Sequence, residues 1–71
     1  MFATRYTATE YDGTKHSQMR TFNNFKDASN DYNNLISILK TEYYNGVYSA
    51  ILVTITDGEN RIDEYILVDD E

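Results

Sequence analysis

Apolar and polar residues alternate along both ends of the chain, whereas its middle repeats apolar residues at helical spacing. Over residues 2–10 the side chains of Phe2, Tyr6 and Ala8 fall on one side of a two-residue period. That period, with threonine and aromatic enrichment, predicts a half-buried strand. Asp12-Gly13 follows, and glycine tolerates the positive φ of tight hairpin turns. A second strand is therefore expected from about Thr14 to Phe22.

A two-residue turn at Asp12-Gly13 would also set the register of this hairpin. In that register Tyr6 lies opposite Met19, and Glu10 lies opposite Lys15, which is a favourable cross-strand pair. It also places two like charges opposite each other, Arg5 and Arg20.

The middle of the chain carries apolar residues at spacings of three and four from Phe25 to Tyr43. This is the stripe of an amphipathic helix. Asn23-Asn24 suits the N-cap, because Asn accepts a hydrogen bond from a free N–H of the first turn. Asn45-Gly46 suits a left-handed C-cap. The pattern predicts a helix over about 25–44.

The last third of the chain predicts a second hairpin. Residues 47–56 are β-branched and aromatic, residues 57–60 read Asp-Gly-Glu-Asn, and residues 61–68 alternate again. A turn centred on 57–60 would place Ile55 opposite Ile62 and Ile51 opposite Ile66.

The order ββαββ predicts one α+β domain over residues 1–71, a four-stranded antiparallel sheet with the helix packed on one face. The strand orders 2-1-3-4 and 1-2-4-3 both keep every neighbour antiparallel, and the pattern favours neither. The helix is expected to cover one set of side chains: Phe2, Tyr6, Ala8, Met19, Ile51, Val53, Ile55, Ile62, Ile66 and Val68.

The opposite face of the sheet is expected to meet water or a partner. The N-terminal hairpin would present polar residues there, namely Arg5, Thr7, Thr9, His16, Gln18 and Arg20. The C-terminal hairpin would present four large side chains, Tyr48, Leu52, Tyr65 and Leu67. Such a group on adjacent strands predicts an interaction patch, unless an offset helix or a long side chain half-buries it.

Charge is concentrated in the last fifteen residues. Residues 1–56 hold five basic and five acidic side chains, so the net charge of −6 belongs to 57–71. The acidic residues proposed to surround the patch are Asp57, Glu59, Asp63, Asp69 and Asp70. A negative field of this kind repels nucleic-acid phosphates and favours a basic partner. Alternatively, it serves solubility and the protection of an edge strand.

The sequence gives little support for a catalytic site or a metal site. The chain has no cysteine and one histidine, His16, which would lie exposed on a strand. The segment Asp57–Glu64 resembles a calcium loop in composition, but its glycine is second rather than sixth. The three glycines are isolated, so no phosphate-binding loop is present. We therefore expect no enzyme, no cofactor and no metal site.

In composition the chain is similar to accessory proteins of phages and mobile elements, many of which block a host enzyme or defence complex. The first hypothesis is a non-enzymatic protein-binding module, an inhibitor that occupies a basic, nucleic-acid-binding surface of a host or defence protein. Two alternatives are a structural homodimer without an outside target and a weak single-stranded nucleic-acid binder through Arg5, Arg20 and the tyrosines. With no signal-like start and no long apolar run, a cytoplasmic location is expected, in the host cell if the protein is viral.

Overall fold

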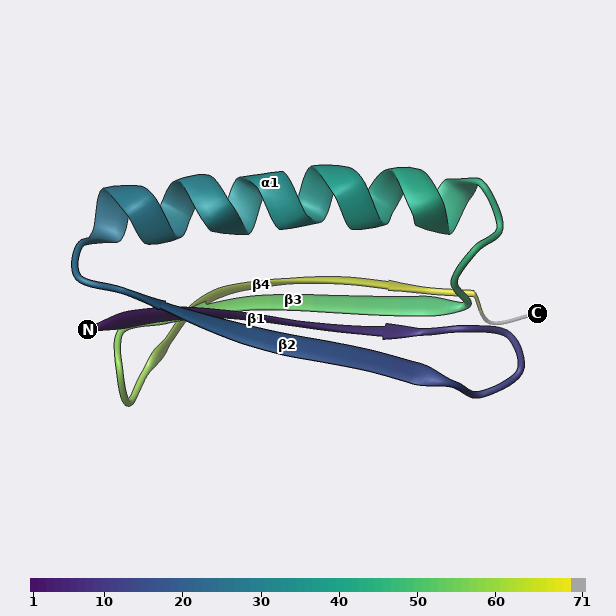
Figure 1. The fold of residues 1–71 in the computed structure, drawn as a ribbon, viewed down its shortest axis with the longest axis horizontal. Coiled ribbons are helices and arrows are strands. Elements are labelled where there is room, and N and C mark those ends of the chain that lie inside the picture. The colour runs from purple at the N-terminus through teal and green to yellow at the C-terminus, as the bar shows by residue number, and fades with distance from the viewer. Residues whose placement is uncertain (70–71) are drawn as a thin grey trace.

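The computed structural model describes residues 1–69 and confirms the α+β fold, with one helix packed on one face of a four-stranded antiparallel sheet (Figure 1). The elements are β1 (Phe2–Thr9), β2 (Lys15–Phe22), α1 (Phe25–Tyr44), β3 (Ala50–Thr56) and β4 (Arg61–Val68). The strand order is β2-β1-β3-β4. The structure thereby decides between the two orders that the pattern allowed, and β2 and β4 become the edges.

The core lies between α1 and the two central strands. The helix contributes Ala28, Tyr32, Leu35 and Leu39, and the strands contribute Ala8, Ile51, Val53 and Ile55. Burying a large aliphatic side chain contributes about 1.5–3 kcal/mol. This two-layer packing is therefore the main source of stability in a chain without disulfides.

Both ends of α1 are capped as the sequence predicts. The N–H of Asp27 donates to the side-chain oxygen of Asn24 at 2.9 Å. At the other end Gly46 has φ +84°, and its N–H donates to the carbonyl of Tyr43 while that of Val47 donates to Glu42. These two bonds form the Schellman motif, which satisfies carbonyls left free by the last turn.

The first hairpin has a three-residue loop, so the predicted two-residue register is wrong. The N–H of Glu10 donates to the carbonyl of Thr14 at 2.8 Å, and Gly13 has φ +94°. A three-residue loop ending in a left-handed glycine is the next most common hairpin connection. The longer loop shifts the pairing by one residue, which brings Met19 opposite Arg5 and His16 opposite Ala8.

The second hairpin has the predicted register next to its turn, and the register shifts by one residue beyond the first pair. Thr56 pairs with Arg61, as expected, but Ile55 pairs with Asp63. Ile62 is therefore the extra residue of a β-bulge, which leaves one strand a residue longer than its partner. Because side chains alternate between faces, every residue of β4 after the bulge turns to the face opposite the predicted one.

These two shifts correct the predicted core. Phe2, Tyr6, Ala8, Ile51, Val53 and Ile55 pack on the helix side as expected. Four other side chains predicted to lie under the helix are exposed, Met19, Ile62, Ile66 and Val68. Their places are taken by Phe22, Tyr65 and Leu67, which are half-buried against the core.

Candidate functional site

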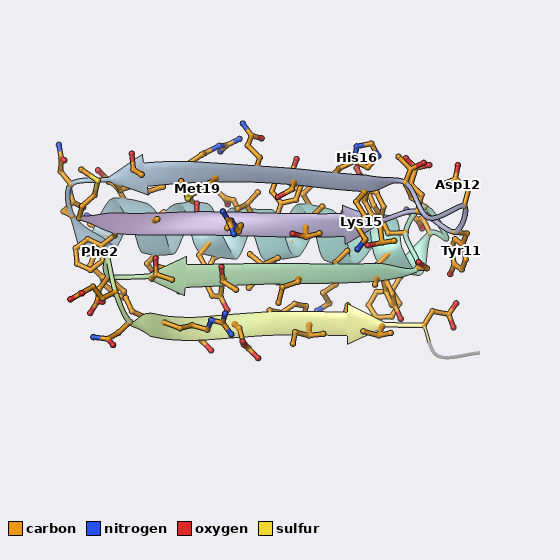
Figure 2. The ribbon with its side chains drawn as sticks, turned by 90° about the horizontal axis from the view of Figure 1, so that it is seen from below. Phe2, Tyr11, Asp12, Lys15, His16 and Met19 are labelled. Carbon is orange, nitrogen blue, oxygen red and sulfur yellow. The ribbon has the colours of Figure 1, made fainter. Side chains whose placement is uncertain are left out.

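The side of the sheet opposite α1 is covered by no other element of residues 1–69, and we call it the uncovered face (Figure 2). Its largest apolar side chains are Met19 on β2, Leu52 on β3, and Ile66 and Val68 on β4. Met19, Ile66 and Val68 are 56, 52 and 58% exposed. An apolar group distributed over three strands of one face is a candidate docking surface.

A shallow hollow of about 280 Å³ lies in the uncovered face. Its lining combines two guanidinium side chains with three threonines and three apolar residues: Ala3, Arg5, Thr7, Met19, Leu52, Thr54, Thr56 and Arg61. Arg61 donates to the carboxylate of Glu64. Within residues 1–69, no carboxylate pairs with Arg5. The hollow therefore presents one unneutralised positive charge among apolar and hydroxyl groups.

The four anchor residues predicted from the sequence do not form one patch. Leu52 alone lies on the uncovered face, where it lines the hollow. Tyr65 pairs with Val53 and Leu67 pairs with Ile51, so both face α1 and are half-buried against the core. The prediction that these two side chains face outward is wrong, because it did not include the bulge at Ile62.

Tyr48 also packs against the core, just before β3. Its ring meets that of His16 edge-on, with 6.2 Å between the centroids. Burial, together with the nearby carboxylate of Glu42 on the helix, raises the pKa of the Tyr48 phenol above 10.0. His16, predicted to lie on the open face, is thus on the helix side, where its ring is 2.5 Å from the carboxylate of Glu10.

The predicted acidic residues do not surround an apolar patch. Asp57 and Glu59 lie in the turn between β3 and β4, at one end of the sheet. Asp69 follows β4 at the opposite end and accepts a hydrogen bond from the Tyr11 hydroxyl at 2.8 Å. Asp63 lies opposite Ile55, on the helix side of the edge. Asp70 lies outside the described residues.

The two arginines expected to lie side by side are on opposite faces. Arg5 faces the hollow, whereas Arg20 pairs with Thr4 across the strands and donates to Asp31 of α1 at 2.8 Å. The pair of cations on which a phosphate contact depended is therefore absent. Among residues 1–69, no three His, Cys, Asp or Glu side chains gather as metal ligands.

No family model, curated protein or solved structure matches the chain. Its function therefore has to be argued from its own geometry. Over the part of the chain that the structure describes, no helix has the length and apolar character needed to cross a membrane.

The exposed apolar residues of the uncovered face were missed because both hairpin registers were off by one. One signal in the sequence pointed to the correct first register: the two-residue turn placed Arg5 opposite Arg20, and like charges directly opposite each other are unfavourable. The three-residue loop removes this clash and gives Arg20 the carboxylate of Asp31. No comparable signal marks the bulge at Ile62, which follows the turn in an otherwise regular alternation.

Proposed function

We propose that this chain is a non-enzymatic protein-binding module that docks a partner protein on its uncovered face. The observation that carries the proposal is the exposure of Met19, Ile66 and Val68 beside Leu52 on a face that no other element covers. A few well-packed side chains near the centre of an interface carry most of its binding energy once the partner excludes water from them.

The chemistry of the partner follows from the charges on this face. Arg5 has no ion pair within residues 1–69 and lines the hollow beside Leu52 and Met19. A carboxylate of the partner entering the hollow would pair with this guanidinium, and charge-assisted hydrogen bonds are about twice as strong as neutral ones. The partner surface is therefore apolar with an acidic group, rather than basic as the net charge alone suggested.

Affinity capture with matched variants tests this proposal. Met19→Glu and Leu52→Glu place a charge on the uncovered face, and Ile38→Glu is the control for Met19→Glu, because Ile38 on the helix is as exposed as Met19, whereas Leu52 is half-buried. We expect a protein captured by the wild-type chain to be lost with both face variants and kept with the control. Equal capture by all of them, with unchanged circular dichroism, would exclude the uncovered face.

A second candidate function is the inhibitor that occupies a basic, nucleic-acid-binding surface of a host or defence protein. It is favoured by the net charge of −6 and by exposed carboxylates around β4, including Asp57, Glu59 and Asp63. Binding of this kind would weaken steeply with salt and with Asp57→Asn and Glu59→Gln, but would survive Met19→Glu. The same capture experiment therefore separates the two candidates.

A further inference from the structure

The two edges of the sheet differ in their protection against pairing with another chain. The edge strand β2 carries charged and polar side chains along its length, including Lys15, His16, Gln18 and Arg20. Charged residues at an edge discourage pairing with another strand. The edge strand β4 carries charges in its first half, Arg61, Asp63 and Glu64, but residues 65–68 have none, and Ile66 and Val68 are exposed there. An edge of this length and apolar character is a template for a further strand.

The hydrogen bonds of β4 define which backbone groups point outward. The N–H of Asp69 donates to the carbonyl of Ser49 at 2.8 Å, so residues 63, 65, 67 and 69 bond towards β3. In an antiparallel pair the intervening residues direct their N–H and C=O groups away. Glu64, Ile66 and Val68 therefore present an outward row of donors and acceptors. In the monomer the outward N–H of Glu64 is bonded to the side chain of Asp63 at 2.8 Å, and this bond has to be exchanged when a further strand pairs here.

We propose that β4 pairs antiparallel with β4 of a second copy of this chain, across a two-fold axis at Tyr65. Two sheets of four strands then join into one continuous sheet. In this register Glu64 lies opposite Ile66, and these two residues exchange their outward backbone hydrogen bonds on both sides of the axis. A closed two-fold contact of this kind buries the same edge on both copies.

Charge selects this register over its neighbours. With the axis at Glu64 or at Asp63, a carboxylate lies opposite its own copy, and with the axis at Ile66, Asp63 lies opposite Asp69. Like charges directly opposite each other on paired strands are destabilising. With the axis at Tyr65, Arg61 of each copy is level with Asp69 of the other, and Ile62 is level with Val68. This register therefore opposes no like charges, although Glu64 lies opposite Ile66 and Asp63 opposite Leu67.

The proposal concerns the edge of β4 and shares Ile66 and Val68 with the uncovered face, but Met19, Leu52 and Arg5 lie on the other strands, so variants at those three residues test the uncovered face alone. The pairing of β4 also has a distinct salt dependence. Each copy carries a net charge of −6, so salt screens the repulsion between copies and strengthens this association. Binding of a basic partner would instead weaken with salt.

Cysteine trapping tests the register, since the chain has no cysteine of its own. Tyr65 on the axis forms a non-hydrogen-bonded pair with its own copy, about 4.5 Å apart between Cα atoms, which lies within the range a disulfide bridges. Leu67 is the matched control: its two copies are about 13 Å apart along the strands. We expect mild oxidation to cross-link Tyr65→Cys and not Leu67→Cys. Equal cross-linking of both, or none with Tyr65→Cys, would overturn the register.

Sedimentation of the unmodified chain provides a second test that does not depend on a half-buried substitution. We expect a species of twice the chain mass at micromolar concentration, strengthened by added salt. Ile66→Pro removes an outward N–H that the monomer does not use, and proline is tolerated on edge strands. This variant should sediment as a monomer with an unchanged circular dichroism spectrum. A monomeric wild type, or a dimeric and folded Ile66→Pro, would overturn the proposal.

Discussion

Thr4 and Asp31 connect the sheet to the helix: the buried Thr4 hydroxyl on β1 donates to Asp31 Oδ2 on α1 at 2.5 Å. The other carboxylate oxygen of Asp31 accepts from Arg20 at 2.8 Å. One side chain of α1 thus bonds two adjacent strands, and it does so beside the apolar core. Thr4 is 1% exposed, so its hydroxyl depends on this acceptor.

Asp31→Ala should lower the free energy of unfolding by about 1–3 kcal/mol, because it leaves a buried hydroxyl without its acceptor. Urea titration of the two proteins measures the difference. Asp31→Asn keeps an acceptor and should lose less, and Asn30→Ala, an exposed neighbour on the same helix, should change stability by less than about 0.5 kcal/mol. Equal stability of Asp31→Ala and the wild type would contradict a role for this bond.

Tyr65→Ala and Ile66→Ala compare the two faces of β4. Tyr65 is half-buried against the core, whereas Ile66 is 52% exposed on the uncovered face. Tyr65→Ala should cost about 2–3 kcal/mol, below the 3–5 kcal/mol of a fully buried aromatic, and Ile66→Ala should cost less than about 1 kcal/mol. Chemical denaturation at low protein concentration, where dimerisation does not contribute, measures both. If Ile66→Ala lost more stability than Tyr65→Ala, then Ile66 would face the core, as it does in the predicted register without the bulge.

Gly13→Ala should destabilise the chain through backbone strain alone. Gly13 has φ +94°, and an added Cβ would meet no atom within 4 Å. A left-handed conformation costs an L-residue about 1–2 kcal/mol, and asparagine tolerates it better. Gly13→Asn should therefore lose less than Gly13→Ala in thermal unfolding. Equal losses for the two substitutions would indicate a cause other than φ.

Alkaline pH should destabilise the fold partly through Tyr32. Burial, and then the carboxylates of Asp63 and Glu64, raise the pKa of the Tyr32 phenol above its ordinary value of 10.0. The folded chain then holds this proton more tightly than the unfolded chain, so stability is full below pH 10 and falls as pH rises above it. The free energy of unfolding of Tyr32→Phe should fall less steeply over that pH range than that of the wild type, as measured by denaturant titration at several pH values. Identical slopes would show that Tyr32 does not contribute.

The elements themselves were predictable because they depend on local chemistry. The apolar spacing from Phe25 to Tyr43, with Asn24 ahead and Gly46 behind, predicted α1 at the bounds it has. The β-branched alternation and the Asp-Gly turns predicted four strands, and the two layers followed from their apolar sides. None of these steps required knowledge of a distant contact.

The candidate site was less predictable because it depends on which residues of each strand point to the helix side of the sheet and which point to the uncovered face. A single extra residue in the Tyr11-Asp12-Gly13 loop exchanges the faces of β2, and the bulge at Ile62 exchanges those of β4. The sequence tolerates both alternatives, since β4 is apolar on both sides: Ile66 and Val68 on one, Tyr65 and Leu67 on the other.

The sequence by itself determined the helix, the strands, the turns and the net charge, all of which follow from neighbouring residues and composition. Only the tertiary structure decided the strand order, the face that each strand turns to α1 and the placement of the carboxylates. The physical reason is that pairing has a period of two, so one added residue changes no local preference but reverses which side chains reach the core. Packing of Tyr65 and Leu67 against Val53 and Ile51 is a long-range contact, and it is this contact that leaves Met19, Leu52, Ile66 and Val68 on the uncovered face.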